Sequence, residues 1–316
     1  MAHERKIFQQ LNDSLGALVV GQEEIIGQLL VALLSGGHVI LEGVPGTGKT
    51  LLVKVLAQLI QAQFKRVQLT PDVLPSDIIG TNIFDLNSRT FTLVRGPIFT
   101  DILLADEINR TPPKTQSALL EAMEEQQVTL EGNTLALSPL FWVVATQNPL
   151  EFEGTYPLPE AQLDRFLFKL VVDYPAPTAE KRMLLNFQEG FAGKRPDLDK
   201  ITTVTCVESL LEARQQAQRV KVDDKIIDYL LGLVQKTRKH PDLALGASPR
   251  AAVAWLKTAK SSAWLCDRDY VIPDDLKTIA IALLRHRLLL RPEAQLDGVK
   301  IENVITSILK QAPVPR

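Results

Sequence analysis

The sequence predicts an α/β fold, in which a parallel sheet with helices on both faces (an αβα core) is followed by an all-α domain. Three observations support this prediction. Short apolar runs alternate with helical stretches through residues 38–146, an order typical of parallel sheets. A glycine-rich segment joins the first apolar run to a leucine-rich helical stretch. Beyond the prolines near residue 175, the pattern is helical.

The elements of the first part follow in order. Residues 4–36 show two amphipathic helical periods, which break where Gly21 interrupts the apolar spacing. Four apolar runs are predicted to be strands, at residues 38–42, 64–69, 102–105 and 141–146. Two further segments, 89–94 and 128–137, have turn residues at their ends and are expected to form β excursions from the sheet.

The domain boundary is expected at Pro175 and Pro177, which end the last strand-like run. Residues 1–175 then contain the N-terminal helices and the core, and residues 178–316 a helical lid. Within this second part, helices are predicted at residues 207–219, 223–239, 249–266 and 273–286. Short polar loops join them, so they should pack as a bundle.

Composition limits the class of protein. The chain has 316 residues, 46% hydrophobic and 23% charged, as is ordinary for a globular protein of about two domains. A net charge of −2 provides no general attraction for nucleic acid or anionic membranes. No apolar run reaches the roughly 18 residues of a membrane span, and the polar N-terminus does not resemble a signal peptide. We expect a cytoplasmic protein with no membrane span.

For the cysteines and two of the histidines, the sequence gives only expectations about burial. Cys206 and Cys266 lie in apolar surroundings without metal-ligand spacing, so we expect buried free thiols. His38 is expected to pack within its strand. His286, which stands between two arginines, is expected to lie on a solvated helical face.

The most specific segment of the chain follows the first expected strand. It reads GVPGTGKT and matches the phosphate-binding pattern G-x-x-x-x-G-K-[ST] without interruption. Its glycines let backbone N–H groups face phosphates, Lys49 adds a positive charge, and Thr50 adds a hydroxyl for Mg²⁺. We therefore expect a nucleoside triphosphate to bind here. The expected contacts are Gly43, Val44, Pro45, Gly46, Thr47, Gly48, Lys49, Thr50 and Leu51.

Polar side chains also follow two other expected strands. Asp106 and Glu107 come directly after the run 102–105. Asp106 is suited to holding Mg²⁺ and Glu107 to polarising the attacking water. An acidic helix start would explain the same pair without a ligand, but the upstream glycine loop favours catalysis. Asn148 follows the run 141–146, at the strand end where ligands of α/β proteins bind, and alone is equally consistent with a turn.

One arginine of the second part stands at a helix start. Ser248 is a preferred N-cap and Pro249 suits the first helical position, so Arg250 should lie in the first turn. A cation opposes the helix dipole there, and a bound phosphate would compensate for this cost. The alternative is an ordinary solvated arginine.

The longest match to known proteins surrounds the two carboxylates. Residues 103–125, LLADEINRTPPKTQSALLEAMEE, resemble the Walker B signature of MoxR-type AAA+ ATPases, a family of the helix-2 insert clade. Nearly the whole chain is similar to that family, through TPDVLPSD at 70–77, RGPIF at 95–99, ATQNP at 145–149, LDRF at 163–166 and GASPR at 246–250. The resemblance implies a P-loop AAA+ core, a C-terminal helical lid, and hydrolysis of ATP with Mg²⁺.

The resemblance also implies roles for single residues. Asn148 corresponds to sensor 1 and Arg250 to sensor 2. Arg165 corresponds to the arginine finger, which acts on the nucleotide of the neighbouring subunit. Beside Asp164 it could form only a local surface ion pair, but a guanidinium supplied in trans raises such rates by on the order of 10³. The box II segment near the adenine is matched by Val20, Gly21 and Gln22, although a helix-breaking glycine is a sufficient local explanation.

For function, the resemblance implies a homo-oligomer, expected to be a hexameric ring, with a chaperone-like role. Such a ring would remodel, assemble or insert metal into client proteins, together with a von Willebrand factor A-domain partner. A magnesium-chelatase-like motor subunit is an alternative that the sequence does not separate from this one. A helicase-like nucleic-acid motor is less favoured, because the two β excursions carry one arginine and no lysine between them.

Overall fold

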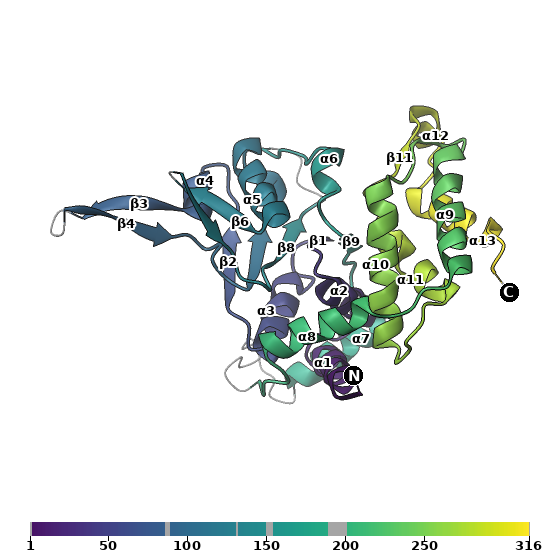
Figure 1. Cartoon of the computed structure of the whole chain (residues 1–316), viewed down its shortest axis with the longest axis horizontal. Helices are drawn as coiled ribbons and strands as arrows, with labels where there is room; N and C mark the ends of the chain where they lie inside the picture. The colour runs from purple at the N-terminus through teal and green to yellow at the C-terminus, as the bar shows by residue number, and fades with distance from the viewer. Residues whose placement is uncertain (1, 86–88, 131, 150–153, 189–200, 316) are drawn as a thin grey trace.

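Five parallel strands form the central sheet of the computed structural model (Figure 1), in the order β2-β5-β8-β1-β9. The structure describes residues 2–85, 89–130, 132–149, 154–188 and 201–315. The strands are β1 (Val39–Glu42), β2 (Phe64–Gln68), β5 (Ile102–Asp106), β8 (Trp142–Gln147) and β9 (Phe168–Val171). β5 is buried throughout, which explains why its sequence is apolar without alternation. The four predicted strands are confirmed, and β9 forms one edge.

Helices cover both faces of the sheet, so the αβα prediction is confirmed. On one face, Leu104 and Val144 pack with α1 (Ala2–Leu18), α2 (Glu23–Ser35) and α3 (Lys49–Leu59). On the other face, Leu103 and Val143 pack with α4 (Pro75–Ile79) and α5 (Pro113–Glu125). Successive residues of a strand point to opposite faces, and each strand therefore supplies both cores.

Two antiparallel hairpins extend from this core, one at each predicted β excursion, although the strand that pairs with residues 90–95 was not predicted. One consists of β3 (Gly80–Asp85) and β4 (Thr90–Arg95), and it projects well beyond the rest of the molecule (Figure 1). The other consists of β6 (Gln127–Leu130) and β7 (Asn133–Ala136). A 3₁₀ turn (Ile108–Arg110) follows β5, and the short helix α6 (Glu160–Leu163) precedes β9.

The second part is helical, as predicted. Its helices are α7 (Pro177–Gln188), α8 (Val207–Gln218), α9 (Asp224–Lys239), α10 (Pro249–Leu265), α11 (Pro273–Leu284), α12 (Pro292–Leu296) and α13 (Ile301–Gln311). Two short strands, β10 (Leu243–Leu245) and β11 (Leu289–Leu290), form a small sheet that the sequence pattern did not predict. α10 begins as expected, because the Ser248 hydroxyl accepts a hydrogen bond from the Ala251 N–H at 3.1 Å. Helix α8 packs against both α2 and α10, so one apolar core runs from the sheet into the helices.

Two expectations about single residues are wrong. The cysteines are free thiols, as expected, but they are not buried: Cys206 is half-buried and Cys266 is exposed, because α10 ends at Leu265 and Cys266 lies in the turn that follows. His286 is buried, since the end of α11 packs against β9, and its Nε2 donates to the Phe166 carbonyl at 3.0 Å. Burial holds the pKa of His286 well below its ordinary value.

His38 packs as predicted. Its Nε2 donates to the Met123 carbonyl at 3.1 Å, and its Nδ1 accepts from the Val143 N–H at 2.9 Å. Burial lowers the pKa of His38 to about 4, so this imidazole is neutral at physiological pH. Within the described ranges, no helix has both the length and the apolar character that crossing a membrane requires.

Candidate nucleotide site

The glycine-rich loop joins β1 to α3, at the carboxyl end of the sheet. Gly43 follows β1 where the chain passes close to a neighbouring segment, and a Cβ at this position would lie 2.2 Å from the Val172 carbonyl oxygen. Gly48 precedes α3 with a φ of +82°, a conformation that other residues rarely adopt. Both positions therefore require glycine for backbone reasons, and the loop leaves the N-terminus of α3 facing a cavity.

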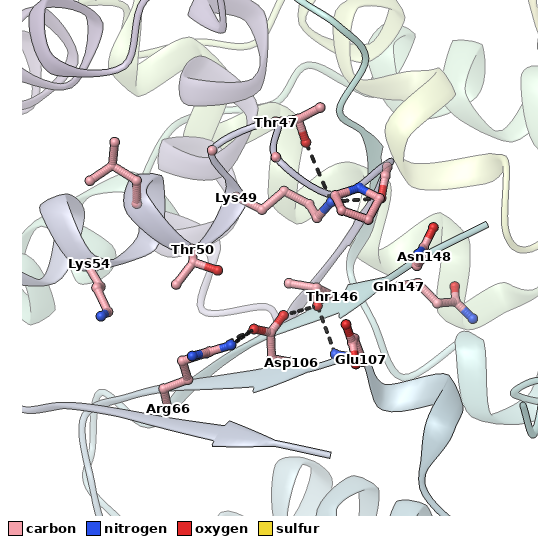
Figure 2. Close-up of a pocket in the computed structure, with 15 residues that line it drawn as sticks. Thr47, Lys49, Thr50, Lys54, Arg66, Asp106, Glu107, Thr146, Gln147 and Asn148 are labelled. Atoms are coloured by element: carbon pink, nitrogen blue, oxygen red, sulfur yellow. Dashed lines mark hydrogen bonds and ion pairs between the residues drawn. The ribbon is translucent and has the colours of Figure 1, made fainter. Parts of the chain in front are cut away.

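This cavity has a volume of about 510 Å³, within the range of small-molecule sites (Figure 2). It is lined by Gly43, Pro45, Gly46, Thr47, Gly48, Lys49, Thr50, Leu51, Lys54, Arg66, Asp106, Glu107, Thr146, Gln147 and Asn148. The structure thus brings together residues from the loop, from β2, from the carboxyl ends of β5 and β8, and from the first turns of α3. Val44 does not line the cavity, but its carbonyl oxygen accepts a hydrogen bond from Lys49.

Lys49 lies folded against its own loop. Its Nζ donates to the carbonyl oxygens of Gly43 at 2.7 Å and Val44 at 2.8 Å. Burial lowers the pKa of Lys49, while Asp106 and Glu107 act in the opposite direction. An ammonium group held by neutral carbonyls is available to a phosphate, because charge-assisted contacts to an anion are stronger.

Asp106 stands at the end of β5 and accepts hydrogen bonds on both carboxylate oxygens. The Thr146 hydroxyl donates to one oxygen, and Arg66 donates to the other from Nε at 2.9 Å and Nη2 at 2.6 Å (Figure 2). Sequence reasoning missed Arg66 as well as Lys54. The parallel register of β2 and β5, which pairs Gln68 with Asp106, brings Arg66 near this carboxylate, and this register is set by the tertiary structure.

Glu107 adopts a left-handed backbone conformation, with φ 60° and ψ 53°. Such a conformation costs about 1–3 kcal/mol in a residue other than glycine and is found where surrounding contacts enforce it, often at active sites. Its N–H donates to the Thr146 hydroxyl at 2.9 Å, and its carboxylate accepts from Gln68 at 2.7 Å and Arg110 at 3.1 Å. The turn directs the carboxylate toward the cavity, and Asn148 lies buried at the end of the adjacent strand.

Arg165 and Arg250 lie together, but not in this cavity. Both line a second cavity, where Arg165 Nε is 3.3 Å and Arg250 Nη1 is 3.2 Å from the carboxylate of Glu124. The local ion pair considered for Asp164 and Arg165 is replaced by other partners, since Asp164 contacts Arg287 at 2.6 Å. The positive charge of Arg250 in the first turn of α10 is thus balanced by the Glu124 carboxylate.

Gly21 and Gln22 flank the glycine-rich loop without lining its cavity. Gln22 Nε2 donates to the Asp173 carbonyl at 3.3 Å, just beyond the segment that Gly43 approaches. Gly21 has a φ of +83°, and a Cβ there would lie 2.7 Å from Ala179. The structure therefore places both residues between α2 and the chain that leaves β9.

Comparisons with known proteins agree with this geometry. Residues 38–168 match the ATPase family associated with various cellular activities (AAA), and residues 235–308 match the AAA lid domain. The chain is 48% identical to the uncharacterized protein YeaC of Bacillus subtilis, over 100% of this chain and 98% of that protein. It is 42% identical to chaperone MoxR1 of Mycobacterium tuberculosis, over 99% of this chain and 82% of MoxR1.

A solved structure supports the same assignment over the whole length. The crystal structure of a putative ATPase from Cytophaga hutchinsonii superposes with a TM-score of 0.90 at 38% identity, covering 100% of this chain and 97% of that one. The fold of the core and of the helical lid is thus shared with that structure over nearly its whole length. This chain belongs to the MoxR family of AAA ATPases.

Proposed function

We propose that this chain is a Mg²⁺-dependent ATPase whose nucleotide site is completed by a neighbouring copy, and which uses ATP hydrolysis to remodel client proteins. The observation that carries this proposal is the separation of the site residues into two groups. Lys49, Asp106 and Glu107 line one cavity, whereas Arg165 and Arg250 line another. A γ-phosphate bound at Lys49 would therefore lie in a different cavity from the two arginines of its own chain.

Within the first cavity, the residues divide the work of hydrolysis. Thr50 and Asp106 offer hydroxyl and carboxylate oxygens, the ligands that Mg²⁺ takes from protein beside phosphate oxygens. Asp106 already forms an ion pair with the guanidinium of Arg66, so this carboxylate is positioned to interact with a cation. Mg²⁺ would neutralise charge on the β- and γ-phosphates. We assign to Glu107 the orientation and deprotonation of the attacking water, and to Asn148 a contact with the γ-phosphate.

The second cavity supplies what the first one lacks. Phosphoryl transfer in this class of enzymes is accelerated by a guanidinium that stabilises charge on the transferred phosphate. Arg165 and Arg250 come from different parts of the chain, yet both meet at one point of the surface, where a ligand from another molecule has access. The side chain of Arg250 is 51% exposed. Both arginines therefore suit a role in trans, which requires an oligomer, most simply a closed ring of identical subunits.

A mixing experiment tests this arrangement. The Lys49→Ala protein lacks a working phosphate loop but keeps both arginines, and the Arg165→Ala protein has the reverse defect. Each should hydrolyse ATP at a small fraction of the wild-type rate, and a mixture should recover activity, because a Lys49→Ala subunit donates its Arg165 to the neighbour. Arg219→Ala, an exposed arginine outside both cavities, is the matched control and should retain activity. A mixture that remains inactive while both variants assemble with each other would refute action in trans.

The client role rests on the family. One relative is named a chaperone, and the projecting hairpin β3–β4 offers an exposed aromatic pair, Phe84 and Phe91, with ring centroids 5.2 Å apart. We assign the client contact to this hairpin and expect a von Willebrand factor A-domain protein as partner of a hexameric ring. Affinity capture with Glu107→Gln, which should bind ATP without hydrolysing it, tests this expectation. Recovery of chelatase subunits instead would identify a dedicated metal-insertion motor.

A further inference from the structure

Glu124 connects the two arginines of the second cavity. It lies in the last turn of α5, and its two carboxylate oxygens face different partners: Oε2 is 3.3 Å from Arg165 Nε, and Oε1 is 3.2 Å from Arg250 Nη1. Arg165 belongs to the core, just after α6, whereas Arg250 begins α10 of the helical part. One carboxylate thus joins two segments that are far apart in the sequence.

Among the charged side chains that line the cavity, Glu124 is the carboxylate that pairs with both arginines. Four cationic side chains and two carboxylates line the cavity, among the residues that the structure describes. The other carboxylate, Asp164, is engaged with the buried guanidinium of Arg287 at 2.6 Å. Lys257 also lines the cavity and forms no ion pair with any described residue. The cavity therefore carries more positive than negative charge and is suited to an anion.

We propose that Glu124 is a placeholder for the terminal phosphate of the neighbouring subunit's nucleotide. A carboxylate that binds two guanidinium groups through its two oxygens reproduces the contacts that a phosphate would make with them. In a protomer without such a phosphate, Glu124 keeps Arg165 and Arg250 directed at one point. When the phosphate arrives, it displaces Glu124 and takes both arginines. This inference rests on the proposed function, since it requires the arginines to act in trans.

The exposure of the three side chains determines how strong this competition is. Glu124 is 37%, Arg165 31% and Arg250 51% exposed, so solvent screens both ion pairs. Each pair then contributes about threefold to an equilibrium constant and, because such factors multiply, the two together contribute about tenfold. Such contacts hold the arginines in place yet yield to a dianionic phosphate. Electrostatic repulsion between Glu124 and the incoming phosphate also favours the displacement of Glu124 from the two arginines.

Neutralising the carboxylate should therefore strengthen the contact between subunits. In Glu124→Gln, we expect the protein concentration that gives half-maximal specific ATPase activity to fall by about five- to tenfold. Sedimentation with a non-hydrolysable ATP analogue should show assembly shifted by the same factor. Glu125→Gln is the matched control, because Glu125 is the adjacent exposed acid of α5 and forms no ion pair with the described residues. It should leave the midpoint unchanged.

Two further results show whether Glu124 acts as a placeholder or only positions the arginines, and whether the proposed function itself fails. In an Arg165→Ala, Arg250→Ala background, Glu124→Gln should no longer shift the assembly midpoint. If Glu124→Gln lowers kcat at saturating protein, or behaves as Glu125→Gln does, the placeholder is refuted while the trans arginines stand. If Arg165→Ala leaves both hydrolysis and assembly unchanged, the trans arrangement itself fails, and the placeholder fails with it.

Discussion

Replacing Arg287 with alanine should destabilise the protein strongly, although the residue lies in a stretch that looks solvated in the sequence. Its side chain is 4% exposed, and its guanidinium holds the segment that carries Arg165. Nε donates to the Asp164 carboxylate at 2.6 Å, and the two terminal nitrogens donate to the carbonyls of Leu167 at 2.9 Å and Phe166 at 2.7 Å. Burial lowers the pKa of Arg287 and Asp164 opposes this, but an arginine remains charged.

The size of the effect follows from these contacts. Breaking a buried ion pair by removing one partner costs about 3–5 kcal/mol, and a buried carbonyl that loses its donor adds about 1–3 kcal/mol. The Asp164 side chain is 25% exposed, so water can partly replace the lost contact. These contributions overlap, and we expect the free energy of unfolding to fall by about 3–4 kcal/mol in Arg287→Ala.

Urea denaturation followed by circular dichroism measures this change. Arg287→Lys keeps the charge but loses the planar fork, so it should recover only part of the stability. Arg219→Ala, at an exposed position, should change the free energy of unfolding by less than about 0.5 kcal/mol. A loss below about 1 kcal/mol in Arg287→Ala would show that the hydrogen bonds to residues 164–167 do not hold this segment.

Three other predictions concern the site and its surroundings. Lys49→Ala should abolish ATP binding in a fluorescent-nucleotide titration, since the loop loses its only charged contact to the phosphates; micromolar binding would contradict this role. Arg66→Ala should lower the Mg²⁺ concentration that gives half-maximal ATPase activity, because Arg66 competes for Asp106; an unchanged Mg²⁺ dependence would exclude such competition. His38 has its pKa lowered to about 4 in the folded chain, so the unfolded chain binds more protons between about pH 6.5 and 4, and stability falls as the pH falls through this window. Relative to His38→Gln, the wild type should lose ~2 kcal/mol between pH 7 and 5 in urea unfolding, and an equal loss in both proteins would refute the assignment.

Features encoded by neighbouring residues could be predicted from the sequence. The loop around Lys49, the start of α10 at Ser248 and the continuous apolar run of β5 depend on backbone geometry and burial within a few residues. The same holds for most helix limits, because amphipathic periods and prolines act locally. Cys266 and His286 were misjudged because their exposure depends on what packs around the ends of α10 and α11.

The sequence by itself determined the αβα core, the helical lid and the phosphate loop, since each is marked by residue types at short, fixed spacings. Only the tertiary structure decided which charges meet. Arg66 reaches Asp106 because β2 and β5 are parallel neighbours in one register. Arg165 and Arg250 meet at Glu124, away from Lys49, because the lid packs against that side of the core. Such contacts join residues that are distant along the chain, and no local period encodes the packing that brings them together.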